Sequence, residues 1–271
     1  MLDGNRPLDW AYRLFVYGLG GLAIAFMVAP VVVGLAMSFT AGQTLKFPPD
    51  GLSLRWYSAL LDPGQSAPIH TAILHSAQIA VLTVLGAVLV AAPAAYGVTR
   101  LKPAASAAVE PLMLAPLVLP SLVYGLAALI ASGRVGLSPS FGLVVFGHIV
   151  VFGPLMYRSC AAITQRLDPS LEEASALLGV GPLRTFLRVT LPLMLPGILA
   201  GMFLVFMQSL DNVSVTLFLA DARTTVLPLR MFQMIEESLD VRVAAISGML
   251  IGAVLLCLIV SWKALEPKRQ G

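Results

Sequence analysis

The feature that most limits how this chain folds is a series of six long apolar runs between residues 14 and 262. An α-helix needs roughly 20 apolar residues to cross a hydrocarbon layer about 30 Å thick. We therefore expect an all-α protein of the lipid bilayer with six transmembrane helices. The helices are predicted over residues 14–39, 71–98, 109–132, 141–163, 193–219 and 243–262.

Composition agrees with a membrane protein and excludes several functions. Hydrophobic residues make up 58% of the chain and charged residues 11%, which is outside the usual range of soluble domains. A net charge of +3 gives no support for nucleic-acid binding. The two cysteines and three histidines have no metal-ligand spacing, so we expect no metal site. The first apolar run is too long for a signal-peptide core and is expected to be retained.

The distribution of Lys and Arg predicts the orientation. Cytoplasmic loops carry an excess of these residues. Placing the N-terminus inside puts 11 of the 17 in the cytoplasm, and it puts both termini and the loop 168–192 there as well. The eleven are Arg6, Arg13, Arg100, Lys102, Arg158, Arg166, Arg184, Arg188, Lys263, Lys268 and Arg269.

The loop 168–192, DPSLEEASALLGVGPLRTFLRVTLP, is the most patterned polar stretch. Its first helix starts either with a Ser170–Glu173 capping box or with Asp168 as N-cap and Pro169 at the first helical position. Gly179 stands where a helix favours a left-handed C′ residue. We expect two short amphipathic helices. Their apolar stripes are Leu171, Ala174, Leu177 and Leu178, then Leu183, Phe186 and Leu187. By this pattern alone, the loop is either a connector covering the inner ends of the spans or a docking element.

The order of residues in the loop favours docking. Glu173-Ala174-Ser175, three residues, Gly179, nine residues and then Val189-Thr190-Leu191-Pro192 resembles the EAA loop of ABC-importer permeases, with Ser for the second Ala and Val for Ile. Residues 70–262 resemble the five-helix core of the type I, MetI-like class. The resemblance implies an N-terminal helix and loop (1–69), a permease domain (70–262) and a cytoplasmic tail (263–271).

Within that class, the closest resemblance is to the second permease of spermidine/putrescine importers. Residues 114–120, 210–213 and 227–232 carry it. Polyamine permeases tend to have a second acid where Asn212 stands, so this chain departs from the pattern. A polyamine-like amine is the first expectation for the solute. Relatives that import ferric iron, opines, aminophosphonates or thiamine keep the alternative open.

The resemblance implies a complex in a bacterial inner membrane. Its other members are a second permease forming a heterodimer, two cytoplasmic ATPases and an external solute-binding protein. The chain has no phosphate-binding P-loop, so it is expected not to be an enzyme and to hold no cofactor, with ATP and Mg bound by the ATPase. Leu183 and Phe186 are expected to tie the loop to the bundle. The residues expected to couple to the ATPase are Glu172, Glu173, Ala174, Ser175, Gly179, Leu183, Leu191 and Pro192.

The candidate solute pathway is a polar interruption, residues 208–214, inside the fifth apolar run. An ionisable residue at membrane depth is a functional hypothesis. Asp211 lies 19 residues after Pro192, which is about 28 Å of continuous helix. It therefore either faces the translocation cavity or caps a short helix at the outer interface. Asn212, Gln208 and Tyr124 are weaker candidates for the same cavity, and the last two are alternatively helix–helix hydrogen bonders.

Two other functional classes remain as alternatives. A secondary transporter or channel works without an ATPase and often carries repeat symmetry. We find no internal repeat in this sequence. A membrane-embedded scaffold transports nothing and needs no pathway.

Overall fold

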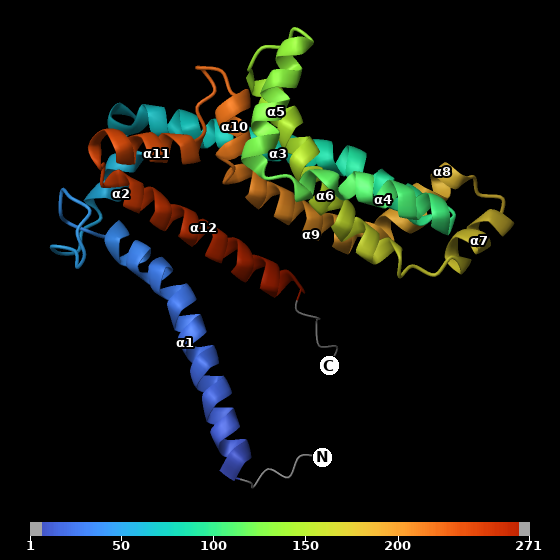
Figure 1. Cartoon of the computed structure of the whole chain (residues 1–271), viewed down its shortest axis with the longest axis horizontal. Coiled ribbons are helices and arrows are strands. Elements are labelled where there is room, and N and C mark those ends of the chain that lie inside the picture. Colours follow the sequence, from blue (N-terminus) through green and yellow to red (C-terminus); the bar gives the residue numbers. More distant parts are fainter. Residues whose placement is uncertain (1–6, 266–271) are drawn as a thin grey trace. The chain divides into compact units, whose positions relative to one another are not determined.

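A computed structural model of the chain describes residues 7–265, with side chains described from Trp10 to Leu256 and at Ile259. The regular structure of this part is helical, apart from one isolated β-bridge between Thr40 and Leu52. This confirms the predicted all-α class (Figure 1). The helices are α1 (Pro7–Ser38), α2 (Arg55–Leu61), α3 (Pro63–Thr99), α4 (Pro103–Val118), α5 (Ser121–Arg134), α6 (Phe141–Thr164), α7 (Ser170–Leu177), α8 (Pro182–Thr185), the π-helix η1 (Phe186–Thr190), α9 (Leu191–Leu210), α10 (Ser214–Leu219), α11 (Leu227–Ser238) and α12 (Arg242–Leu265).

Four helical stretches within the described residues are long and apolar enough to cross a membrane. They are Trp10–Ser38, Pro63–Thr99, Phe141–Thr164 and Pro182–Leu210. They correspond to the first, second, fourth and fifth predicted spans. The sixth predicted span is α12, whose described apolar part, Arg242–Leu256, is shorter than a full crossing. The end of that span and the tail from residue 263 lie outside the described side chains.

The third predicted span, 109–132, is not one straight helix. It consists of α4 and α5, which meet at an angle of 101° (Figure 1). Leu119 and Pro120 leave the helical region, with ψ values of 130° and 128°. A proline has no N–H to donate and pushes the preceding residue toward extended backbone. The predicted span is therefore interrupted near its middle, because Pro120 breaks the helix there.

The fifth predicted span, 193–219, is also broken. Helix α9 ends at Leu210 and α10 begins at Ser214. The Asn212 side-chain Oδ1 accepts a hydrogen bond from the Val215 backbone N–H at 2.8 Å. Such a bond caps a new helix N-terminus and stabilises the break.

The chain divides into two compact units, and each is described by itself. One unit is Met1–Ala67 with Met231–Gly271, and the other is Pro68–Arg230. In the first, α12 packs against α1 and α2, and the Tyr57 hydroxyl donates to Ser38 Oγ at 2.8 Å. The predicted division into 1–69, 70–262 and 263–271 stays a prediction.

The second unit is built on the pairing of α6 with α9. A Cβ atom added at Gly197 would lie 2.6 Å from the Ser159 carbonyl oxygen, and one at Gly201 would lie 2.6 Å from Met156 Sδ. Glycines four residues apart let the two helix backbones approach closely. This close pairing gives the bundle a continuous core that carries the loop at one end.

A buried polar cluster lies inside the same unit. His148 Nδ1 lies 2.8 Å from Ser209 Oγ, and His148 Nε2 lies 3.1 Å from Thr216 Oγ1. Ser209 Oγ also donates to Thr83 Oγ1 at 3.4 Å. These side chains come from α6, α9, α10 and α3. The cluster therefore joins four helices beside the break between α9 and α10.

Candidate functional site

The candidate site is the loop between α6 and α9, which begins with a capped helix. Asp168 Oδ1 accepts a hydrogen bond from the Ser170 backbone N–H at 2.9 Å, and the Asp168 carbonyl accepts one from Leu171. Pro169 has helical angles, φ −57° and ψ −26°. Asp168 is therefore the N-cap, which selects one of the two predicted starts. The hydrogen bonds from Ser170 lower the pKa of Asp168.

The turn between α7 and α8 has the predicted left-handed glycine. Gly179 has φ +77°, a conformation that residues with a Cβ rarely adopt. The Val180 N–H donates to the Ser175 carbonyl at 3.1 Å, which closes the end of α7. The buried hydroxyls of Ser175 and Thr185 lie 2.8 Å apart and join α7 to α8. Local bonds thus hold the two short helices as one compact piece, called the coupling piece below (residues 168–185).

The coupling piece presents a large apolar surface. Leu177, Leu178 and Leu183 are 89%, 83% and 70% exposed. Leu183 was expected to tie the loop to the bundle, and that expectation was wrong. The same expectation was confirmed for Phe186, whose ring centroid lies 4.9 Å from that of Tyr96 in α3. An exposed group of leucines beside a polar rim is typical of a protein-interaction surface.

Glu172 fastens the coupling piece to the membrane helices. Arg100 Nη2, just beyond α3, donates to Glu172 Oε1 at 2.7 Å, and Thr190 Oγ1 of η1 donates to the same oxygen at 2.9 Å. The Tyr96 hydroxyl donates to Glu172 Oε2 at 3.3 Å. One carboxylate therefore links α7 to the end of α3 and to η1, which leads into α9.

The charge state of Glu172 follows from opposing effects. Partial burial acts to raise the pKa of Glu172. The hydrogen bonds from Arg100, Thr190 and Tyr96, together with the positive charge of Arg100, lower this pKa by more than burial raises it. The net pKa is below the ordinary value, so the carboxylate is ionised at neutral pH. The same bond to Glu172 raises the pKa of Arg100. The pair is therefore charged on both sides.

The other coupling residues take different positions. Glu173 and Ala174 are exposed on the outer side of α7, while Leu191 is half-buried against the core. Pro192 lies in the first turn of α9, where its missing N–H costs little. Arg100, Tyr96 and Thr190 were missed from sequence. Their only signal was that Arg100 closes the second span, 72 residues before Glu172.

The predicted pathway residues are not gathered in one cavity. Gln208 and Asp211 are exposed at the end of α9. Asn212, not Asp211, caps α10. Of these residues, only Tyr124 lines the cavity of about 890 Å³ in the second unit. The expectation that Asp211 caps the short helix was wrong, because the side chain one residue later does so.

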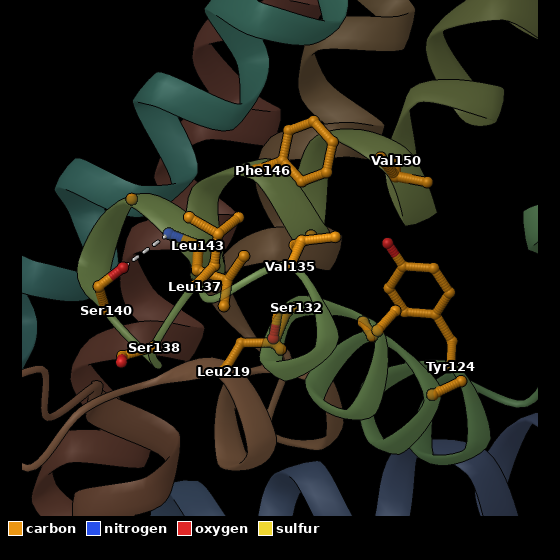
Figure 2. A pocket seen from close by; sticks show the side chains of 15 residues that line it. Tyr124, Ser132, Val135, Leu137, Ser138, Ser140, Leu143, Phe146, Val150 and Leu219 are labelled. Atoms are coloured by element: carbon orange, nitrogen blue, oxygen red, sulfur yellow. Dashed lines mark hydrogen bonds between the residues drawn. The ribbon is translucent and has the colours of Figure 1, made fainter.

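That cavity lies between α5 and the first half of α6, and no charged side chain lines it. Figure 2 shows Tyr124 at one end of the cavity and Ser138 and Ser140 at the other. Alanine, valine and leucine side chains make up most of its wall. The arrangement offers space and a few hydroxyl groups but no fixed charge.

Comparison with known proteins identifies the class to which this geometry belongs. Residues 84–269 match the family described as binding-protein-dependent transport system inner membrane component, so the chain belongs to that family. It is an ABC-transporter permease, a multi-pass membrane subunit that is not itself catalytic.

The relatives of this chain are named for different transported solutes. The chain is 26% identical over 249 residues to the putrescine transport system permease protein PotI of Escherichia coli (strain K12), covering 89% of this chain and 87% of the relative. It is 32% identical over 203 residues to the molybdenum transport system permease protein ModB of Mycobacterium tuberculosis (strain ATCC 25618 / H37Rv), covering 69% and 77%. A solved bacterial ABC transporter that imports alginate shares the fold, with a TM-score of 0.71 at 16% identity, covering 96% and 98%.

Proposed function

We propose that this chain is one half of the permease of an ATP-driven importer in a bacterial inner membrane, moving a small amine-bearing, polyamine-like solute by alternating access. The coupling piece carries the proposal. Its leucines are exposed, yet its backbone is capped and Glu172 anchors it to two other helices. A rigid apolar element between α6 and α9 can bind a partner protein, and movement of that partner would then move these two helices.

The partners follow from this arrangement. Two ATPase subunits bind ATP and Mg on the cytoplasmic side and receive the coupling pieces, a second permease completes a heterodimer, and a solute-binding protein delivers the cargo outside. The family's description names binding-protein dependence, which supports the last partner. Both termini of this chain lie in the cytoplasm. The chain itself supplies Glu172, Glu173, Ala174, Ser175, Gly179, Leu183, Leu191 and Pro192 to the coupling region.

The amine cargo is supported by the putrescine permease among the relatives and by the exposed Asp211, which offers a negative charge beside the break. A second candidate is the same machine importing another solute. The molybdenum permease at 32% identity and the uncharged wall of the large cavity favour this alternative.

The importer is tested by co-purification and by ATPase assay. The expected result is a stable complex of this chain with an ATPase, whose hydrolysis rate rises when the loaded binding protein is added. A chain that transports alone in proteoliposomes, with no ATPase present, would instead be a secondary transporter. A thermal-shift screen of the binding protein with putrescine, spermidine and molybdate identifies the solute. Stabilisation by molybdate alone would refute the amine cargo and leave the machine class standing.

A further inference from the structure

A second, smaller cleft lies at the foot of the coupling piece. It has a volume of about 300 Å³, and its wall is mostly polar. A water molecule occupies about 30 Å³ of liquid, so the space matches roughly ten waters or one small organic molecule. The cleft is formed by the end of α3, the first half of α4, the end of α6 and the residue that opens α7. Its lining is Val98, Thr99, Arg100, Ser106, Glu110, Tyr157, Thr164, Gln165, Leu167 and Pro169.

The negative side chain in the cleft differs from the positive one in having no ion-pair partner among the described residues. Two charged side chains line it, Arg100 and Glu110. The charge of Arg100 is taken up by Glu172 at 2.7 Å. Glu110 is half-buried in an otherwise apolar helix and forms no ion pair or hydrogen bond with the described residues. One carboxylate charge therefore remains unbalanced in the cleft.

The cleft also contains hydroxyl oxygens that can accept a hydrogen bond from a ligand. Tyr157 is only 2% exposed, yet its hydroxyl makes no hydrogen bond within the described part of the chain. That hydroxyl is not among the fully buried unpaired atoms, so it opens onto the cleft that the residue lines. The Thr164 hydroxyl donates to the Cys160 carbonyl at 2.8 Å, which leaves its oxygen free to accept. A primary ammonium group has three N–H donors and one positive charge, which fits these acceptors.

We propose that this cleft binds the ammonium group of a small primary amine, with Glu110 as counter-ion and the hydroxyls of Tyr157 and Thr164 as acceptors. The proposal rests on the importer function and gives its cargo class a second site at the cytoplasmic end. Arg100 and Pro169 both line the cleft and both position α7. An amine bound in the cleft that these residues line favours one placement of α7 over others, because a ligand shifts an equilibrium through its unequal contacts with the two states. We expect the favoured placement to be one that resists movement of the coupling piece, so that amine accumulating in the cytoplasm slows further import.

The test measures binding of radiolabelled putrescine to the assembled permease–ATPase complex in lipid nanodiscs, without the binding protein. We expect saturable binding to the wild type that molybdate does not compete away. In Glu110→Gln the affinity is expected to fall roughly tenfold or more, since the amide keeps an acceptor but removes the negative charge that strengthens the hydrogen bond. Tyr157→Phe keeps the ring and removes one acceptor, and the expected loss is about threefold to tenfold. Glu237→Gln, an exposed residue outside the cleft, is the matched control and is expected to bind as the wild type does.

Transport assays separate this proposal from the importer function. Proteoliposomes preloaded with putrescine are expected to import more slowly than empty ones, and Glu110→Gln relieves the inhibition. Wild-type-like affinity in both cleft variants overturns the site. A wild-type complex that imports but binds no putrescine in the nanodisc also overturns it, while the importer function stands. Glu110-dependent binding of putrescine without ATP-driven uptake supports the cleft site and refutes the importer function. If Glu110→Gln does not assemble, Tyr157→Phe decides alone.

Discussion

Two polar segments interrupt the apolar chain, and their polar groups find partners in different ways. In 168–192, the carboxylate of Glu172 is held by Arg100, Tyr96 and Thr190, which come from other elements. In 208–214, Asn212 bonds only to the next turn of the chain. The neighbouring carboxylate, Asp211, is exposed. The turn of the first segment is tied across the bundle through Glu172, whereas in the second segment the turn itself, residues 211–213, is stabilised by local bonds and only Ser209 before it bonds to distant helices.

This difference matters for function. A segment fixed at several distant points moves with the helices that hold it, so a pull on the coupling piece reaches α3 and α9 together. In the turn 211–213, the bonds of the Asn212 cap alone would leave the helices on either side free to change their angle. The buried His148 cluster limits that freedom on the inner side of the break. We therefore interpret the first segment as a lever and the second as a hinge that carries an exposed charge.

The largest expected effect tests the lever. Gly179→Asp is expected to reduce ATP-driven uptake to background while the protein still inserts in the membrane. A Cβ at this position meets nothing within 4 Å, and aspartate tolerates positive φ better than most residues, so the fold is kept. An unpaired carboxylate buried at the apolar docking surface costs about 3–5 kcal/mol, or more than roughly 100-fold in affinity. Uptake into proteoliposomes and co-purification of the ATPase measure the loss.

The matched control is Gly179→Asn, which also accepts a left-handed backbone but adds no charge. We expect this variant to keep a substantial part of the uptake. Wild-type transport by Gly179→Asp would show that this turn does not meet the ATPase, and the coupling assignment would be wrong.

The second prediction concerns the ties of the lever. Arg100→Ala and Glu172→Gln are each expected to lower the free energy of unfolding by about 1–3 kcal/mol, because each leaves a partly buried charged group without its partner. In a double-mutant cycle the two effects are expected to be non-additive by at least about 0.5 kcal/mol. Glu173→Gln, one residue further on and exposed, is the control and is expected to change stability little. Additive losses would mean that the two side chains act separately.

The same tie predicts a pH dependence. The folded pKa of Glu172 lies below the ordinary value of 4.5. A carboxyl group with a lowered folded pKa stabilises the protein fully above its unfolded pKa, and this stability is lost as the pH falls through the folded pKa. The stability gap between wild type and Glu172→Gln is therefore constant above about pH 5 and closes at more acid pH. Thermal unfolding of both proteins across this range measures the gap. A gap that widens on acidification would contradict the assigned charge state.

The two segments also differ in how far their sequence predicts them. In the loop, the features that follow from neighbouring residues were found: two short helices, the left-handed Gly179 between them, and the Asp168 start as one of two alternatives. The Arg100–Glu172 tie was missed, because the two residues are 72 positions apart and no local pattern joins them. Leu183 was placed on the bundle although it is exposed, since an apolar residue has the same appearance in sequence whether it faces the core or a partner.

The spans show the same limit. The length of the apolar runs predicted most of the membrane-spanning helices, but hydropathy does not show where a helix bends or ends within a run. The bend at Pro120 and the cap at Asn212 each turn a long apolar run into two helices. Both signals were present as single residues. Glu110 was also passed over, because it stood at the expected edge of a span and its cleft is made by residues from four separate stretches.

The third test addresses the hinge. Asn212→Ala removes the cap of α10 and is expected to lower the free energy of unfolding by about 1 kcal/mol. Asn212→Asp keeps an acceptor at the same place and is expected to retain most of that stability, while adding the second acid that polyamine permeases tend to have. Chemical denaturation or thermal unfolding measures both variants. Equal stability of Asn212→Ala and wild type would mean that the break does not depend on its cap.

The smallest effect on stability is expected for Asp211→Asn. The side chain is exposed at the C-terminus of α9, where a negative charge is slightly unfavourable, so the free energy of unfolding is expected to stay the same or rise slightly. Its effect on transport is expected to be larger than its effect on stability. Without the charge, the KM for an amine solute is expected to rise, whereas the KM for an uncharged or anionic solute is expected not to rise. Uptake kinetics with putrescine, compared between Asp211→Asn and Glu237→Gln, separate a local charge effect from a general one. Unchanged kinetics and preference in Asp211→Asn would remove this residue from the pathway, and the hinge would then be a purely structural break.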